Sequence, residues 1–228
     1  EFKRQIAKIG KPVDKKEWFM TPPTVNAYYD PQNNNINFPA GILQPPFYDN
    51  KIDEAVNFGG IGAVIGHELT HGFDDEGGRF DAKGNLDNWW TEADAKAFEE
   101  RTSCMAKQYA EYPGTPDLKL NGKLTLGENV ADNGGLRIAY MALMDTLAGK
   151  TQPKIDGFTP EQRLFLGWGQ IWCTNYTEQA LRLRTQTDPH SPGRWRVNGV
   201  VSNMPEFQKA FSCKLGQPMA RENACRVW

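Results

Sequence analysis

The pattern His67-Glu68-Leu69-Thr70-His71 constrains this chain more than any other feature of its sequence. In a helix, residues four apart lie on the same face, so the two imidazoles would stand side by side and could bind one metal ion. Glu68 would lie beside the open position of that metal and could activate a bound water. A chance match, with two hydrogen-bonded core histidines, is the competing interpretation.

The residues around this pattern predict a helix with one buried side. Small residues between the apolar ones would let a second element approach closely. The apolar residues expected on the buried side are Ile61, Val64, Ile65 and Leu69. Burying two histidines and a glutamate is unfavourable unless their polar atoms have partners, so partners must come from elsewhere in the chain.

Composition places the chain among ordinary globular proteins. Its 228 residues are enough for one large domain with a substantial core, and its net charge is −2. No basic excess points to a nucleic acid partner or an anionic membrane. No apolar run approaches the roughly 20 residues that span a bilayer. The chain begins at Glu1 rather than Met, which predicts a start that was processed, cloned or cut from something longer.

Local patterns predict a mainly helical chain with a little β-structure. Thr91 and Thr159 are expected to cap helices, and Asn121-Gly122 indicates a hairpin turn. The expected helices are a short one before Gly10, Thr91–Tyr112, Leu126–Leu147, Thr159–Tyr176 and Met204–Ser212; the expected strands are Thr24–Tyr29, Ile36–Phe38 and a hairpin within Leu118–Leu124; the expected loops are Gly77–Trp90 and Gln186–Arg196.

A third metal ligand must come from outside the pattern, because a catalytic zinc has three protein ligands and one open position. A longer pattern with Gly at 74 and His at 77 is excluded, since the chain has Asp74 and Gly77. Glu92 directly follows the expected cap at Thr91. An acidic residue is favoured there by the helix dipole, so its presence does not require a role in metal binding. We therefore expect Glu128 to be the third ligand.

The sequence after Glu128 supports this choice. Asp132 lies four residues later, on the same face of the expected helix, and can accept the free N–H of a ligating histidine. Asp74, three residues after His71, could do the same for the other histidine. The pair Gly134-Gly135 interrupts the helix at a cost of about 1 kcal/mol per glycine, which predicts close contact with another element.

Two features stay open on the residues alone. The four cysteines form no C-x-x-C pair, so they allow either two disulfides in three connectivities or four free thiols. Asn26 could hold an extended peptide along an edge strand, but its local pattern favours an ordinary strand residue that faces solvent.

Several stretches together resemble the neprilysin-type zinc endopeptidases of family M13. The match rests on H-E-L-T-H-G-F-D-D and G-E-N-V-A-D-N-G-G. It continues, in the family's order, through V-N-A-Y-Y, F-P-A-G-I-L-Q-P-P-F, D-P-H-S-P-G-x-x-R-V and the terminal C-R-V-W. The resemblance covers essentially the whole chain.

This resemblance implies a mainly α (α+β) fold with a thermolysin-like zinc peptidase core. It also implies that His67, His71 and Glu128 bind one catalytic Zn²⁺ and that Glu68 is the general base. The implied reaction is the hydrolysis of oligopeptides on the amino side of large apolar residues.

The resemblance extends to residues that would contact the substrate. Asn26 and Ala27 would hold the substrate backbone, which reverses the local preference at Asn26. His190 would stabilise the oxyanion, and Arg196 would bind a substrate carbonyl. Asp132 would orient a ligand and is sometimes assigned as a proton donor. The pocket for a large apolar residue would be lined by Ile42, Phe47, Val64, Ile171 and Trp172, each of which could equally be plain core.

The resemblance also places the chain within a larger protein. Residues 1–228 would be the C-terminal portion of the catalytic domain, partnered by an N-terminal segment of the same protein that is absent here. Cys104 and Cys225 would form a disulfide, whereas Cys173 and Cys213 resemble cysteines that bond to that segment. The expected location is extracytoplasmic: secreted, periplasmic or on a membrane-anchored ectodomain.

Two other functions remain as alternatives. A non-catalytic peptide-binding or adhesion module could keep zinc for stability, although a structural zinc closes its fourth position with a protein ligand. A zinc aminopeptidase would need an acidic cluster for the free amino terminus of its substrate, and no such motif is evident.

Overall fold

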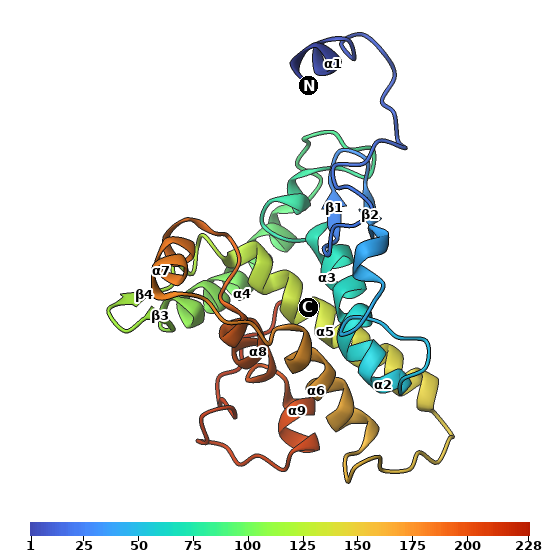
Figure 1. Ribbon diagram of the computed structural model, residues 1–228. Helices are drawn as coiled ribbons and strands as arrows, with labels where there is room; N and C mark the ends of the chain where they lie inside the picture. The colour runs from blue at the N-terminus through green and yellow to red at the C-terminus, as the bar shows by residue number, and fades with distance from the viewer.

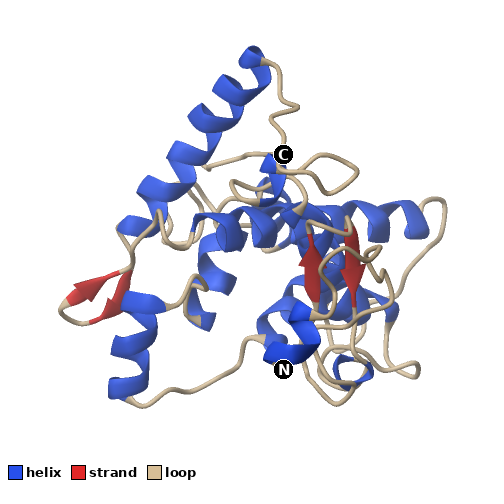
Figure 2. Ribbon diagram, turned by 90° about the horizontal axis from the view of Figure 1, so that it is seen from above, coloured by secondary structure: helices blue, strands red, loops and turns tan.

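The computed structural model describes residues 1–228, and helices are its main regular structure (Figure 2). Its two sheets are separate two-stranded hairpins. The α-helices are α1 (Phe2–Ile6), α2 (Glu54–Asn57), α3 (Ala63–His71), α4 (Glu92–Ala110), α5 (Leu126–Leu147), α6 (Pro160–Ile171), α7 (Glu178–Thr187), α8 (Gly193–Val201) and α9 (Pro205–Ala210). The remaining elements are the strands β1 (Tyr28–Asp30), β2 (Asn35–Asn37), β3 (Pro113–Thr115) and β4 (Leu118–Lys119), the 3₁₀ turns η1 (Ala40–Ile42) and η3 (Gly77–Arg79), and the π-helical segment η2 (Phe58–Gly62). None of these helices is both long and apolar enough to cross a bilayer.

The fold is organised around α3 and α5, which pack against each other in the middle of the molecule (Figure 1). The predicted close contact at Gly134-Gly135 is confirmed. A Cβ on Gly66 would lie 2.6 Å from the carbonyl oxygen of Gly135, and a Cβ on Gly135 would lie 2.4 Å from the backbone nitrogen of His67. Only glycines let the two backbones come this close.

The face that α3 buries differs from the expected one. Ile61 and Val64 are buried as expected, but Ile65 and Leu69 are 44% and 49% exposed. The small-residue side of the helix packs on α5, because that side allows the shortest distance between the two backbones. Ile65 and Leu69 are thereby turned away from α5.

The main core lies around α5, α6 and α8. Leu136 and Leu143 of α5, Leu164 and Trp168 of α6, and Val200 of α8 are almost completely inaccessible. Thr159 caps α6 as predicted, with its side chain bonded to the backbone of Gln162 and the Gln162 side chain bonded back. Ala63 and Val64 of α3 belong to the same core cluster, so this packing also holds α3 against α5.

The first hairpin is shorter than expected. β1 pairs with β2 antiparallel from Tyr28↔Asn37 to Asp30↔Asn35. The predicted strand Thr24–Tyr29 therefore starts four residues too early, and Asn26 and Ala27 precede the paired region.

The second hairpin turns at a different place from the one predicted. β3 pairs with β4, so the chain reverses at residues 116–117 rather than at Asn121-Gly122. The Asn121 carboxamide instead accepts hydrogen bonds from the backbone of Lys123 and Leu124. It shapes the turn that leads into α5, which spans Leu126–Leu147 as predicted.

The region after α6 holds more helix than predicted. α6 ends at Ile171 rather than near Tyr176, and α7 begins soon afterwards because the side chain of Thr177 accepts from the backbone N–H of Ala180. The predicted loop Gln186–Arg196 is consequently reduced to residues 188–192 between α7 and α8. A threonine followed by a glutamate is typical of a helix start, so the Thr177-Glu178 pair could have predicted this cap.

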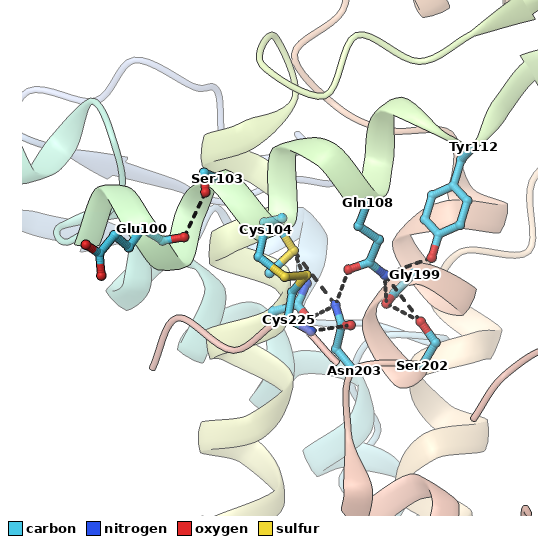
Figure 3. Close-up of a disulfide and its surroundings, with 11 residues drawn as sticks. Glu100, Ser103, Cys104, Gln108, Tyr112, Gly199, Ser202, Asn203 and Cys225 are labelled. Carbon is cyan, nitrogen blue, oxygen red and sulfur yellow. Dashed lines mark hydrogen bonds between the residues drawn. A yellow bond between two sulfur atoms is a disulfide. The ribbon is translucent and has the colours of Figure 1, made fainter. Parts of the chain in front are cut away.

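The disulfide implied for Cys104 and Cys225 is present, with the two sulfurs 2.00 Å apart. It joins α4 to the C-terminal segment (Figure 3). Beside it, the backbone N–H of Cys225 donates to Asn203, whose amide nitrogen donates to Gln108 at 2.9 Å. The thiols of Cys173 and Cys213 are not bonded to each other.

Candidate metal and peptide site

The two histidines of the pattern lie one turn apart on α3, as predicted. Their Nε2 atoms are 2.9 Å apart, and their rings meet nearly at right angles. His67 is buried, and His71 is partly buried. The helix thus presents two imidazole nitrogens to one point.

The contact between α3 and α5 brings Glu128 to the same point. Glu128 Oε2 lies 3.4 Å from His67 Nε2, and Glu128 Oε1 lies 3.6 Å from His71 Nε2. Glu92, in contrast, is exposed in the first turn of α4 and does not line the cleft described below. The geometry favours Glu128 over Glu92 as the third ligand.

A carboxylate orients each imidazole from behind. His67 Nδ1 lies 2.8 Å from Asp132 Oδ1, and His71 Nδ1 lies 2.6 Å from Asp74 Oδ2. The other oxygen of Asp74 accepts the backbone N–H groups of Glu76 and Gly77. Each carboxylate therefore keeps a proton on Nδ1 and directs the lone pair of Nε2 toward the other histidine.

This donor set fits a divalent metal. Two imidazole nitrogens and a carboxylate converge at separations of 2.9, 3.4 and 3.6 Å, an arrangement that either a proton or a metal cation between them would stabilise. Ligands at about 2.0–2.1 Å from a tetrahedral zinc are about 3.3 Å apart. His67, His71 and Glu128 match that separation, so they would hold the ion and leave one position open.

The electrostatics of the three groups agree with a cation site. Burial disfavours the charged form of His67, yet hydrogen bonds with Asp132 and Glu128 outweigh burial and raise the pKa of His67 to about 10. Burial likewise opposes the charged form of Glu128, but His67 and Arg196 hold the pKa of that carboxyl well below its usual range. In the absence of metal, a proton satisfies this site, and a metal would displace it.

Glu68 lies next to the three ligands without a protein donor of its own. It is 4% exposed, and a carboxylate oxygen lies within 4.8 Å of a ring nitrogen of each histidine. Burial raises the pKa of Glu68. A buried carboxylate with a raised pKa, close to a metal site, has the properties of a proton acceptor that can also return the proton.

Arg196 is the cation nearest to this cluster. Its Nε and Nη2 atoms donate to both oxygens of Asp132 at 2.7 and 2.6 Å, and its guanidinium lies 3.9 Å from the centre of the Trp172 ring. Asp132 is thus shared between Arg196 and His67. This arrangement favours an orienting role for Asp132, because its oxygens are fully occupied and 99% of its surface is inaccessible.

His190 lies across the ligand group from α3, in the loop between α7 and α8. Its Nε2 is 3.2 Å from Glu128 Oε1, and its Nδ1 is 2.7 Å from Asp188 Oδ1. Asp188 was not among the site residues predicted from the sequence. The short Asp-x-His spacing could have predicted this contact. It lets one carboxylate reach both the ring and the backbone N–H of the histidine.

A cleft of about 780 Å³ joins these groups into one site. Asn26 and Ala27 lie along it, directly before β1, where they are not paired with β2. The Asn26 side chain is exposed and its Oδ1 accepts the N–H of Ala27 at 3.0 Å. The structure therefore brings these two residues to the same cleft as the metal ligands.

Four of the five expected pocket residues line this cleft, and one does not. Ile42, Phe47, Val64 and Trp172 are among its walls. Ile171 is instead buried in the main core, because the last turn of α6 directs it to the same side as Leu164 and Trp168. Trp168 lines the cleft in addition, and the sequence offered no sign of this because it looks like any core aromatic residue.

The model of peptidase family M13 matches residues 26–227. The chain belongs to this family. Members of M13 among its relatives include endothelin-converting enzyme 1 of Mus musculus, 48% identical over 96% of this chain, and neprilysin-1 of Caenorhabditis elegans, 48% identical over 97%.

Solved M13 structures share its fold. The Mycobacterium tuberculosis zinc metalloprotease Zmp1, determined with an inhibitor, superposes over 99% of this chain with a TM-score of 0.95 and 48% identity. This M13 chain spans 29–30% of those two curated relatives and 35% of the Zmp1 chain.

Proposed function

We propose that this M13 chain forms the catalytic centre of a zinc-dependent endopeptidase that hydrolyses oligopeptides. One observation carries the proposal: two histidines and Glu128 converge on one point, with Glu68 beside them, at the edge of a cleft that a peptide chain could enter.

Zinc held by His67, His71 and Glu128 would supply Lewis acidity and lower the pKa of water to about 7. Glu68 accepts a proton from the attacking water and delivers it to the leaving amine. Burial raises the pKa of Glu68, which makes the carboxylate a stronger base when it accepts the proton from water.

Two residues act on the substrate carbonyls. His190 directs Nε2 toward the oxyanion of the tetrahedral intermediate, while Asp188 holds the ring in place through Nδ1. Arg196 donates to a carbonyl of the peptide, and its fixed contacts with Asp132 and Trp172 set its direction. Both groups act without moving far from the positions described above.

The cleft determines how the peptide lies. Asn26 and Ala27 bind the substrate backbone in an extended conformation, as a strand adds to an edge. Ile42, Phe47, Val64 and Trp172 form an apolar pocket for the side chain that follows the cleaved bond. We therefore expect cleavage on the amino side of large apolar residues.

We also propose an extracytoplasmic location and a partner segment within a longer polypeptide. The Cys104–Cys225 disulfide favours an oxidising compartment. The share of the relatives that this chain covers leaves room for an N-terminal portion that restricts access to the cleft.

Product mapping by mass spectrometry on a mixed set of apolar-rich peptides tests this function. Zinc-loaded protein should make internal cuts before large apolar residues, lose activity with a chelator and recover it with added zinc. Removal of single residues from the amino end would instead establish an aminopeptidase. Stoichiometric zinc with no cleavage in the longest natural polypeptide that contains residues 1–228 would establish a non-catalytic binding module.

A further inference from the structure

A buried chain of hydrogen bonds connects the helix that carries Glu128 to the loop that carries His190. Ser191 Oγ donates to Asn129 Oδ1 at 2.8 Å, and Asn129 Nδ2 donates to Thr125 Oγ1 at 2.9 Å. Ser191, Asn129 and Thr125 are 3%, 0% and 3% exposed. Water therefore does not compete for these bonds.

The direction of each bond in this chain is fixed. The Thr125 hydroxyl donates to the carbonyl of Asn121 at 3.2 Å, so it can only accept from Asn129. The amide nitrogen of Asn129 must then face Thr125, and its oxygen must face Ser191. Ser191 is left with one role, that of donor, which only a hydroxyl at this position can fill.

Each end of the chain adjoins a residue of the metal site. Asn129 directly follows Glu128 in the first turns of α5, and Ser191 directly follows His190 in the five-residue connection between α7 and α8. Asp188 holds the ring and the backbone nitrogen of His190 at 2.7 and 2.9 Å, but Asp188 lies in the same loop. The Ser191–Asn129 bond ties this loop to α5, next to the direct contact between His190 Nε2 and Glu128 Oε1 at 3.2 Å.

We propose that Ser191 and Asn129 are positioning residues that fix His190 at its distance from Glu128. The inference rests on the proposed function, in which His190 acts on the oxyanion. A histidine displaced by about 1 Å would lose much of its effect on the transition state and little of its effect on substrate binding.

The test uses Ser191→Ala, Asn129→Ala and the double variant, in the longest natural polypeptide that contains residues 1–228, loaded with zinc. Each single variant should lower kcat about tenfold or more, with KM within about twofold and zinc stoichiometry unchanged. The double variant should lose about as much as one single variant, because the two residues act through one bond. Ser191→Thr keeps the hydroxyl and should recover most of kcat.

Ser202→Ala is the matched control. Ser202 is equally buried, at 2% exposed, and its hydroxyl donates to the carbonyl of Gly199 away from the cleft. The proposal is overturned if Ser202→Ala lowers kcat as much as Ser191→Ala does. It is also overturned if the losses in kcat of Ser191→Ala and Asn129→Ala add in the double variant, or if neither single variant changes kcat.

Hydrogen–deuterium exchange separates this inference from the proposed function. In Ser191→Ala, the backbone amides of residues 188, 190 and 191 should exchange faster, and those of α3 should not; residues 189 and 192 are prolines without an amide hydrogen. If the wild-type protein cleaves no peptide, the proposed function fails, while faster exchange still supports the link between the loop and α5. Unchanged exchange in residues 188, 190 and 191 would overturn the link whatever the activity.

Discussion

Gly135 of α5 lies so close to His67 of α3 that a side chain on Gly135 would overlap the backbone of the metal-binding helix. A Cβ there would be 2.4 Å from the nitrogen and 2.7 Å from the Cα of His67. Glu128 and Asp132 lie on the same helix as Gly135, so the distance between the two backbones decides whether these carboxylates reach the histidines.

Replacing Gly135 should therefore damage the metal site and the fold together. Gly135→Ala must push α5 away from α3, which we expect to lower the free energy of unfolding by about 1–3 kcal/mol and to weaken zinc binding. Thermal denaturation and the zinc content of the purified protein measure the two effects. Gly169→Ala is the control, because a Cβ at that position of α6 meets nothing within 4 Å. Gly169→Ala should keep its zinc, and its free energy of unfolding should rise by about 0.5–1 kcal/mol. Equal zinc content and stability in the two variants would refute the role of the contact between Gly135 and His67.

Glu68→Gln should separate metal binding from catalysis. Glutamine has nearly the same shape but cannot accept the proton, so kcat should fall roughly a thousandfold while zinc stays stoichiometric. Steady-state kinetics and metal analysis on the same preparation provide the check. Turnover near the wild-type value, with zinc present, would rule out Glu68 as the general base.

The third ligand can be identified by comparing two glutamates. Glu128→Val should lose zinc, because only two protein ligands would remain, whereas Glu92→Val should keep it, since Glu92 is exposed in the first turn of α4. Titration with zinc under competition from a chelator measures both affinities. A stoichiometric zinc in Glu128→Val would return Glu92 to consideration.

Asp75 should make stability depend on pH. Burial and the neighbouring charge of Asp74 raise the pKa of Asp75 to about 6, and one of its oxygens is buried without a hydrogen-bond partner. The folded state therefore binds the proton more tightly than the unfolded state, whose aspartates have a pKa near 3.9. The charged Asp75 carboxylate therefore destabilises the folded state. This penalty in the free energy of unfolding is absent below about pH 4, grows as the pH rises to about 6, and is fully present above it.

Asp75→Asn removes this penalty. The variant should be more stable than the wild type at pH 7–8 by about 1 kcal/mol, a value reduced for the solvent that reaches this side chain, and the difference should vanish near pH 4. Denaturant unfolding at several pH values tests the slope. Asp81→Asn should behave in the opposite way, because hydrogen bonds with Asn85 lower the pKa of Asp81. A pH-independent difference at Asp75 would contradict the assignment.

Some of the candidate site followed from the sequence, because it depends on local geometry. The spacing of His67 and His71 places both rings on one helical face wherever that helix lies. The same reasoning placed Asp132 one turn after Glu128. The caps at Thr91 and Thr159 formed as predicted, since a cap is a bond between a side chain and the backbone three residues away.

Other features of the chain depended on contacts between distant residues. Resemblance to family M13 and a carboxylate pair on one helix favoured Glu128, but only the contact between Gly66 and Gly135 brings Glu128 within 3.4 Å of His67. The same contact turned Ile65 to solvent against expectation, because backbone proximity outweighed the burial of one apolar side chain. Ile171 lies in the core rather than in the expected pocket, because the last turn of α6 places it on the same side as Leu164 and Trp168.

The sequence by itself thus determined where α4, α5 and α6 begin and which of their side chains share a helical face, because those properties are set within a few residues along the chain. Tertiary structure alone decided which faces meet, where the cleft opens and which loop approaches α5. Ser191 and Asn129, 62 residues apart, illustrate the difference: their hydrogen bond needs two segments brought together by packing, and no local pattern encodes that distance.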